Sequence, residues 1–307
     1  MVRERNGRAM AEDKRLKSNI FDTALIFEGG GMRVSYTSGF ATMLLEQRLF
    51  FNYVAGISAG SSLAVNYLSR DIERTRRCVT EFVSDPSFGD LKTWLKGEGF
   101  FNSDYIYSES ARQDGVMPYN YDAFCRNEAE CVIGAFKRDF GEMVYWRRKD
   151  YQCLDDLIVR VRASSTVPYL MPVTKIDDIY YVDGGLGTGI PFEPAMEDGY
   201  QRFVFVLTRE RGFRLSPPIR LRILDAVLNN RPIEAEALLT RYERYNRALE
   251  RIEELEREGR AYVFYPEALD VSLVDRDEHK LLKQYLLGHE QAYRELPRLL
   301  AFLGREK

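Results

Sequence analysis

The stretch FNYVAGISAGSSLAVNYLS, residues 51–69, predicts a β-strand, a sharp turn and an α-helix in immediate succession. FNYVAG, residues 51–56, has the composition of a buried strand, and SSLAVNYLS continues as an apolar helix. Between them, GISAG at 56–60 fits the G-x-S-x-G pattern, which exposes a serine on a strained strand-to-helix turn. Ser58 is therefore the first candidate nucleophile in the chain.

The segment before this stretch has the same strand–loop–helix order. TALIFE, residues 23–28, is a short apolar strand, GGGMRVS follows it, and residues 36–50 have apolar side chains at helical spacing. Ser58 follows Gly31 by 27 residues, close to the roughly 30 residues of one βαβ unit. We therefore expect the glycine loop and the serine turn at the carboxyl ends of two adjacent parallel strands, the edge where such sheets bind ligands.

Strands and helices alternate along the rest of the chain, so the predicted class is α/β with a mainly parallel sheet. Helices are expected near 153–163, over about 233–258 and from 277 to about 302. Gly288 and Pro297 are candidate break points in the last of these helices. Further strands are expected at ECVIGAFK (130–137), EMVYWRR (142–148), IYYVDGG (179–185), RFVFVLT (202–208) and YVFYP (262–266).

The stretch 70–128 departs from this alternation, since it is rich in arginine and aromatic residues. We interpret it as short helices and loops that form a cap beside the sheet. Its aromatic side chains are candidates for the lining of an acyl-chain pocket, although an ordinary core of short helices explains them equally well.

The composition excludes several classes of protein. A net charge of −3 argues against a dedicated nucleic-acid-binding protein. The four cysteines and two histidines lack metal-ligand spacing, so we expect no metal and no other cofactor, and reduced cysteines favour a cytoplasmic protein. No apolar run reaches the roughly 18 to 20 residues that span a bilayer, and residues 1–18 are predicted to be a disordered charged tail rather than a signal peptide.

The glycine loop FEGGGMR, residues 27–33, can direct several backbone N–H groups at one point. Placed at a helix N-terminus, such donors can hold a phosphate or stabilise an oxyanion, and a turn without chemistry is the alternative. The loop fits neither G-x-G-x-x-G nor the P-loop pattern. Arg33 adds a fixed positive charge next to any bound anion.

His279 and His289 both lie near the C-terminus in a mixed-charge helical segment, so solvated or partly packed side chains are a better interpretation of them than a base for Ser58. The order Ser, Asp, His fits an α/β-hydrolase, but in that fold more than one strand separates the oxyanion loop from the serine turn. Asp183 follows the apolar run IYYV and precedes two glycines, so a tight turn would direct its carboxylate to the ligand-binding edge. A solvated Asp-Gly turn is the alternative.

Taken together, GGGMR at 29–33, GISAG at 56–60 and DGG at 183–185 resemble the three signatures of the patatin-like phospholipase family. RASSTVPYLMP at 162–172 is similar to the A-S-x-x-x-P segment that precedes the family's catalytic aspartate. The resemblance extends from about residue 23 to 210 and implies a three-layer α/β/α fold. In the stretch LGTGIPFEP, which contains Gly189, this chain lacks the Asn that many members place shortly after the D-G-G turn.

The resemblance implies a Ser-Asp dyad that works without histidine. The implied site consists of the nucleophile Ser58, the base Asp183 and an oxyanion hole formed by Gly29, Gly30, Gly31, Arg33 and Ala59. An unperturbed Asp is a weaker base than His by roughly 3.5 kcal/mol. A single oxyanion donor can contribute about 2.7 to 4 kcal/mol, so several amides together with Arg33 can offset that difference.

The resemblance also implies a domain organisation and a reaction. Residues 19–215 would form the catalytic domain with its cap, and residues 216–307 a helical region packed on the same domain. The leading hypothesis is cleavage of lipid or phospholipid carboxyl esters through an acyl-enzyme. A soluble carboxylesterase is a second hypothesis, and a non-catalytic protein that binds lipids or anions is a third, which the presence of both Ser58 and Asp183 disfavours.

Two segments indicate what the protein could contact besides its substrate. TRERGFRLSPPIRLRI, residues 208–223, combines arginines with apolar side chains and is compatible with peripheral contact with an anionic membrane, although a solvated loop is the better interpretation. The helix around 238–255 has apolar residues spaced four and three apart, and its other face mixes Glu and Arg. That pattern favours packing on the sheet or on a partner helix.

Overall fold

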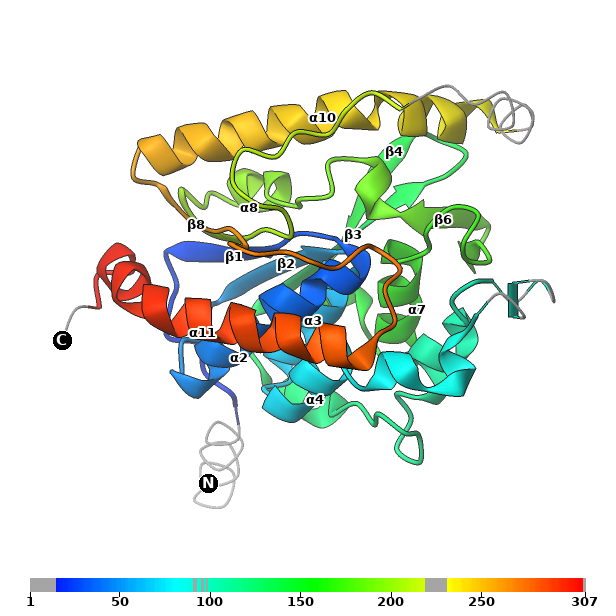
Figure 1. Ribbon diagram of the computed structural model, residues 1–307, viewed down its shortest axis with the longest axis horizontal. Coiled ribbons are helices and arrows are strands. Elements are labelled where there is room, and N and C mark those ends of the chain that lie inside the picture. Colours follow the sequence, from blue (N-terminus) through cyan, green and yellow to red (C-terminus); the bar gives the residue numbers. More distant parts are fainter. Residues whose placement is uncertain (1–14, 91–92, 95–96, 98, 219–230, 306–307) are drawn as a thin grey trace, which may run out of the picture.

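Eight strands form one central sheet in the computed structural model, which describes residues 15–90, 93–94, 97, 99–218 and 231–305. Helices cover both faces of this sheet, with α10 (Pro232–Arg257) on one side and α11 (Glu278–Phe302) on the other (Figure 1). The α/β class, the three layers and the mainly parallel sheet that the sequence predicts are therefore confirmed.

The strands are β1 (Thr23–Phe27), β2 (Tyr53–Ile57), β3 (Glu130–Lys137), β4 (Glu142–Trp146), β5 (Thr174–Ile176), β6 (Ile179–Asp183), β7 (Arg202–Val206) and β8 (Ala261–Phe264). Their order is β5-β6-β3-β2-β1-β7-β8, with β4 also paired to β3. The pairs β1–β2, β2–β3, β1–β7 and β7–β8 are parallel, whereas β4 and β6 run antiparallel to β3. The sequence predicted each of these strands except the three-residue β5.

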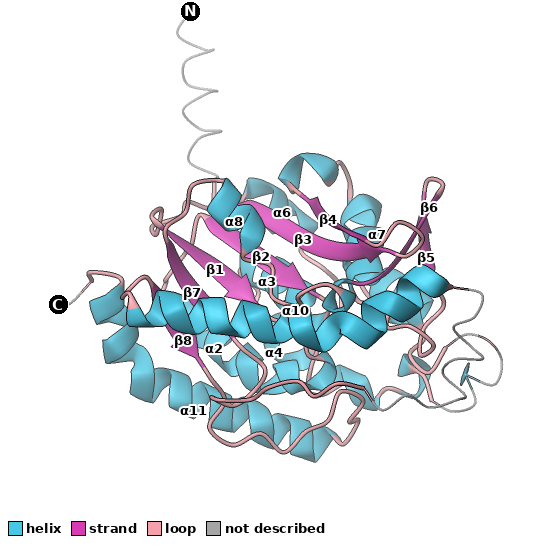
Figure 2. Ribbon diagram, turned by 90° about the horizontal axis from the view of Figure 1, so that it is seen from above, coloured by secondary structure: helices cyan, strands magenta, loops and turns pink. Residues whose placement is uncertain are grey.

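The longer helices are α2 (Val34–Glu46), α3 (Ala59–Leu68), α7 (Leu154–Ser164), α10 and α11, and shorter ones are α4 (Ile72–Arg77), α6 (Tyr121–Arg126) and α8 (Glu193–Glu197). Seen from above, α10 crosses one face of the sheet, and α2, α3 and α11 lie beneath the strands (Figure 2). Side chains of β1 alternate between the two layers, as expected for a strand buried on both faces. Leu25 and Phe27 belong to the core on the α2 side, and Ala24 and Ile26 to the core on the α10 side.

Strand β3 holds two strands end to end along one of its sides. β2 pairs with residues 130–134 of β3, and β6 pairs with residues 135–137. β4 pairs with residues 133–137 and overlaps both, so β4 must occupy the opposite side of β3. β2 and the antiparallel β6 therefore approach each other from opposite directions, and their final residues meet beside Gly134 and Ala135.

The described part of the stretch 70–128 consists of short helices and turns, as predicted, and includes a π-helical turn at Asp104–Glu109. Residues 91–92, 95–96 and 98 lie outside the described residues. Of the predicted N-terminal tail, residues 1–14 also lie outside them, whereas Leu16 forms a bridge with Asn127. Within the described ranges, every helix is too short or too polar to cross a lipid bilayer.

Helix α11 passes through both candidate break points without interruption. Gly288 serves another purpose, because it lies where α11 crosses α2. A Cβ atom at Gly288 would lie 1.9 Å from the carbonyl oxygen of Tyr36, and one at Gly39 would lie 2.3 Å from the backbone nitrogen of His289. The two helices therefore approach as closely as they do because both crossing positions lack a side chain.

Replacing Gly288 by Ala is expected to destabilise the protein by about 1 to 3 kcal/mol, because the added methyl forces the two helices apart. Thermal or urea unfolding measures the effect. Leu286→Ala is the matched control on the same helix, since this side chain is 56% exposed, and its effect should stay within about 0.5 kcal/mol. Equal stability of Gly288→Ala and the wild type would contradict the close helix crossing.

Candidate active site

Ser58 occupies a strained turn between β2 and α3. Its backbone has a φ of +54° and a ψ of −134°, a conformation that non-glycine residues rarely adopt. The Ser58 N–H donates to Ser164 Oγ at 2.9 Å, and that hydroxyl donates to the Gly134 carbonyl at 2.5 Å. A Cβ atom at Gly60 would lie 2.5 Å from the Glu28 carbonyl oxygen, so the final glycine of the motif lets α3 start directly against the end of β1.

The end-to-end arrangement of β2 and β6 brings Ser58 and Asp183 into contact. Ser58 Oγ donates to Asp183 Oδ2 at 2.6 Å. The other carboxylate oxygen, Oδ1, accepts from the Gly185 N–H at 2.6 Å, and the Asp183 N–H donates to the Thr166 carbonyl at 2.8 Å. Both carboxylate oxygens are thus engaged, and the orientation of the side chain is fixed. The sequence motifs predicted Asp183 at this edge, but they did not reveal that β6 runs antiparallel to β3.

Burial raises the pKa of Asp183 above its ordinary value, because the low-dielectric surroundings disfavour the charged form. The hydrogen bonds from Ser58 and from the Gly185 N–H, together with the charge of Arg241, act in the opposite direction but do not cancel the effect. A raised pKa makes the Asp183 carboxylate a stronger base than a solvated aspartate.

The glycine loop lies directly against Ser58, since a Cβ atom at Gly29 would be 3.0 Å from Ser58 Cβ. The Gly29 N–H already donates to the Gly189 carbonyl at 3.1 Å. Within the described part of the chain, the N–H groups of Gly30, Gly31 and Ala59 have no acceptor. Of the amides that the sequence suggested for an oxyanion hole, these three are the ones available to a ligand.

Arg33 is 8% exposed and lies on the wall of the same cavity as Ser58. Burial lowers the pKa of Arg33 to about 10, with repulsion from Arg209 as a further cause, so the guanidinium still carries its charge at neutral pH. Its Nε has no hydrogen-bond partner among the described residues. Arg33 therefore offers a buried positive charge beside the free amides.

The residues that hold the glycine loop in place were not predicted from the sequence. The buried Glu28 carboxylate accepts from Tyr245 Oη at 2.6 Å and from the Thr208 N–H at 2.5 Å. Burial raises the pKa of Glu28, with these hydrogen bonds opposing the rise. The Met32 N–H donates to the Leu273 carbonyl at 3.0 Å. A charged residue at the end of an apolar strand was the available signal for Glu28, whereas no local pattern pointed to Tyr245.

A cavity of about 290 Å³ opens over Ser58, Asp183 and the glycine loop. Tyr169 and Leu273 contribute to its walls, and Arg241 and Leu238 reach it from α10. The cavity is therefore completed by the C-terminal region, which also adds β8 to the edge of the sheet.

The other candidate groups lie elsewhere. His289 contacts Glu46 through Nε2 at 2.8 Å, His279 is exposed, and neither lines a cavity that contains Ser58. The four cysteines are free thiols. A search of the described residues finds no group of three or more His, Cys, Asp or Glu side chains that could hold a metal ion.

The arginine-rich segment 208–223 is described only to residue 218, so Arg220 and Arg222 lie outside the described residues. Arg211 pairs with Glu256 at 2.8 Å, and Arg214 pairs with Glu253 at 2.8 Å. Both of these arginines therefore have an ion-pair partner on α10.

Comparisons with known proteins identify a family for this chain. The model of the family described as "Patatin-like phospholipase" matches residues 25–196, and a "Domain of unknown function (DUF6363)" matches residues 232–304. The uncharacterized protein YjjU of Escherichia coli (strain K12) is 24% identical over 190 residues, which cover 60% of this chain and 51% of that protein. The match thus spans about half the length of the curated relative.

Among solved structures, VipD from Legionella pneumophila is similar with a TM-score of 0.48 and 14% sequence identity. The superposition covers 90% of this chain and 67% of that one.

Asp183→Asn is expected to make the protein more stable than the wild type at about pH 8, because the amide keeps the shape of the side chain without a charge to bury. The pKa of Asp183 is higher in the folded than in the unfolded protein. Between the two values folding takes up a proton, so wild-type stability falls as the pH rises. The advantage of the variant should therefore shrink on acidification, as measured by thermal unfolding over a series of pH values. A constant difference would contradict the raised pKa.

Proposed function

The chain belongs to the patatin-like phospholipase family, and on this premise we propose that it is a serine acyl hydrolase that cleaves lipid carboxyl esters through a Ser58–Asp183 dyad. The observation that carries the proposal is the 2.6 Å hydrogen bond from Ser58 Oγ to Asp183 Oδ2 beside three free backbone amides. A binding protein would need neither the strained serine nor the buried carboxylate.

In the first half of the reaction, Ser58 Oγ attacks the ester carbonyl carbon while Asp183 Oδ2 takes its proton. The carbonyl oxygen becomes an oxyanion, which accepts hydrogen bonds from the Gly30, Gly31 and Ala59 amides and is further stabilised by the charge of Arg33. Collapse of this intermediate breaks the bond to the alcohol, which leaves with the proton from Asp183. The acyl group is then bound to Ser58.

In the second half, water attacks the acyl carbon and Asp183 again accepts the proton. The oxyanion forms in the same place, and its collapse releases the fatty acid and returns the proton to Ser58 Oγ. Gly29 has a structural part in this scheme, because its N–H is held by the Gly189 carbonyl. Glu28 and Tyr245 keep the loop in position through the hydrogen bond between them.

A lipid is the favoured substrate because apolar cavities adjoin the nucleophile. Met32, Phe101 and Met171 line a small space of about 60 Å³ that also contacts Ser58. A soluble carboxylesterase remains the second candidate, since a short ester would meet the same dyad. The four free cysteines support a reducing, cytoplasmic environment.

Contact with the membrane would be peripheral in this proposal. Trp94 is 48% exposed, Tyr169 is 37% exposed, and the indole N–H of Trp94 donates to the Tyr169 carbonyl at 3.2 Å. Tyr169 also lines the cavity over Ser58, so this aromatic pair lies at its rim. Trp and Tyr side chains suit the boundary between water and lipid.

Ser58→Ala and Asp183→Asn are each expected to lower ester hydrolysis by at least about 10³-fold, because either change removes one half of the dyad. Hydrolysis of 4-nitrophenyl butyrate measures turnover, and labelling by a fluorophosphonate measures the reactivity of Ser58 as a nucleophile. Wild type should be labelled and Ser58→Ala should not. His279→Ala is the control and should keep wild-type activity. Retained activity in Asp183→Asn together with loss in His279→Ala would overturn the dyad, and an unlabelled wild type would favour the non-catalytic binding protein.

Trp94→Ser is expected to lower the rate on phosphatidylglycerol vesicles several-fold relative to the rate on 4-nitrophenyl butyrate, since only the vesicle requires the aromatic rim. Phe140→Ser is the matched control, because Phe140 is also exposed, at 60%, whereas Trp94 bonds to Tyr169 on the wall of the Ser58 cavity. A wild-type enzyme that cleaves butyrate esters and leaves the vesicle lipids intact would replace the phospholipase assignment by a soluble carboxylesterase.

A further inference from the structure

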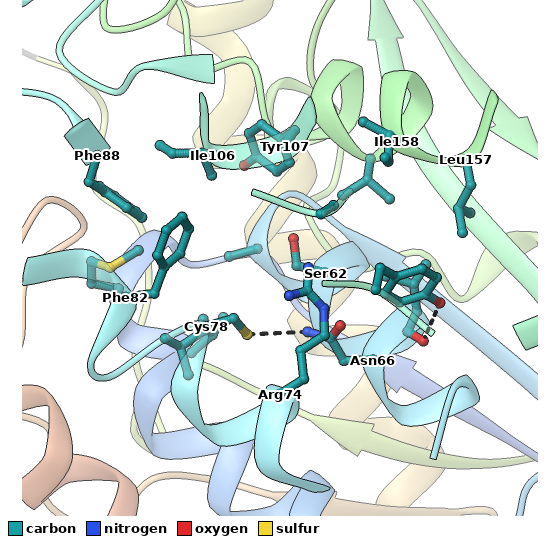
Figure 3. Close-up of a pocket in the computed structure, with 18 residues that line it drawn as sticks. Ser62, Asn66, Arg74, Cys78, Phe82, Phe88, Ile106, Tyr107, Leu157 and Ile158 are labelled. Carbon is teal, nitrogen blue, oxygen red and sulfur yellow. Dashed lines mark hydrogen bonds between the residues drawn. The ribbon is translucent and has the colours of Figure 1, made fainter. Parts of the chain in front are cut away.

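A second cavity of about 110 Å³ lies behind Ser58, between α3, α4, α7 and the cap (Figure 3). Met32, Phe88 and Tyr107 line both this cavity and the small space that contacts Ser58. A chain bound to Ser58 can therefore extend through the small space into the second cavity. Most of its walls are apolar, as an acyl-chain pocket requires.

One wall of this cavity is polar, and it belongs to α3. Ser62 and Asn66 follow Ser58 at intervals of four residues, so the three side chains lie along one side of the helix. Both Ser62 and Asn66 line the cavity. Asn66 is 3% exposed, and its Oδ1 has no hydrogen-bond partner among the described residues.

Helix α4 places a positive charge next to Asn66. Asn66 Nδ2 donates to Cys78 Sγ at 3.2 Å, and Arg74 lies one turn before Cys78 on α4 (Figure 3). The Arg74 Nη1 donates to the Met117 carbonyl, while its buried Nε has no hydrogen-bond partner within the described ranges. No carboxylate of the described residues forms a salt bridge with Arg74, although the neighbouring Arg76 and Arg77 both pair with Glu81.

The two unpartnered atoms have complementary requirements. Asn66 Oδ1 lacks a donor and Arg74 Nε lacks an acceptor among the described residues. A hydroxyl group supplies both at once, whereas a methyl group supplies neither. A carboxylate would satisfy Arg74 but would repel Asn66 Oδ1, and its charge would have to enter a mostly apolar cavity.

We propose that this cavity selects acyl chains that carry a hydroxyl group, which Asn66 and Arg74 bind while Ser62 lines the approach from Ser58. The inference rests on the proposed function of Ser58 and specifies its substrate class. It makes Asn66 and Arg74 specificity-determining residues, and the substrates become esters of hydroxylated fatty acids.

The helix sets the position of the hydroxyl on the chain. Asn66 lies eight residues beyond Ser58, which is about 12 Å along an α-helix. Because its bonds zigzag, an extended acyl chain advances only about 1.3 Å per C–C bond, so it covers this distance in about nine or ten bonds. A hydroxyl near carbon 10 of the acyl chain would therefore reach Asn66 and Arg74.

The test compares three 4-nitrophenyl esters that differ only at this position. The 10-hydroxydecanoate carries the hydroxyl, the undecanoate has a methyl group in its place, and the monoester of undecanedioic acid has a carboxylate there. Wild type is expected to prefer the hydroxy ester over the undecanoate by at least about tenfold in kcat/KM, because the hydroxyl forms one neutral hydrogen bond with Asn66 and one charge-assisted hydrogen bond with Arg74.

Asn66→Leu and Arg74→Met are each expected to abolish this preference and to favour the undecanoate. Arg77→Met is the matched control on α4, because Arg77 lies outside the cavity, and it should keep the wild-type ratio. Thermal unfolding confirms that each variant is folded, and Arg74→Lys offers a second variant that keeps the charge but lacks Nε.

Three other outcomes would each overturn the inference, and the esters used distinguish them from one another. If wild type cleaves 4-nitrophenyl butyrate but does not distinguish the hydroxy ester from the undecanoate, the inference fails and the proposed function stands. A preference for the carboxylate over the hydroxyl replaces it with an anion site. If wild type cleaves no ester at all, the proposed function fails and the inference fails with it.

Discussion

The site depends on one constraint in the sheet, the end-to-end meeting of β2 and β6 along a single side of β3. Neither strand pairs with the other, so β3 alone sets the distance between their last residues. β4 fixes β3 from its opposite side over the five residues that include this junction. A slip of β6 by one residue would turn Asp183 to the other face of the sheet and remove it from Ser58. The register of four strands is thus what holds two oxygen atoms at 2.6 Å.

Residues of the C-terminal region also hold the glycine loop of this site in place. Tyr245 on α10 binds the Glu28 carboxylate, and the Leu273 carbonyl accepts from Met32, so both ends of the glycine loop are fixed by residues beyond 215. Glu28 is buried and its pKa is raised. The hydrogen bond from Tyr245 satisfies this buried carboxylate. A fragment ending before α10 would leave this carboxylate without its hydroxyl donor and would lose the wall that Leu238 and Arg241 form.

Whether a feature can be predicted from the sequence depends on how far apart along the chain the interacting residues lie. β1, β2 and the turn at Ser58 follow from local patterns, and their adjacency follows from the length of one crossover, so these features were predicted correctly. The contact of Ser58 with Asp183 was anticipated from motifs, yet the antiparallel direction of β6 was not, because strand direction depends on pairing with β3. The Glu28–Tyr245 bond joins residues 217 positions apart. No local pattern encodes a contact of that range, and for the same reason the occupied amide of Gly29 could not be foreseen.

Burial has opposite effects on stability and on chemistry at this site. A solvated aspartate would cost nothing to ionise but would be a poor base for a serine hydroxyl. Placing Asp183 among apolar residues raises its pKa, which strengthens the base while making the charged form less favourable in the folded protein. In the proposed reaction, Arg33 and the amides of the glycine loop would stabilise the oxyanion, so the base alone would not have to lower the barrier. In the proposed reaction a histidine would not be required, because the sheet buries the carboxylate and the glycine loop would stabilise the oxyanion that forms when the carboxylate takes the proton.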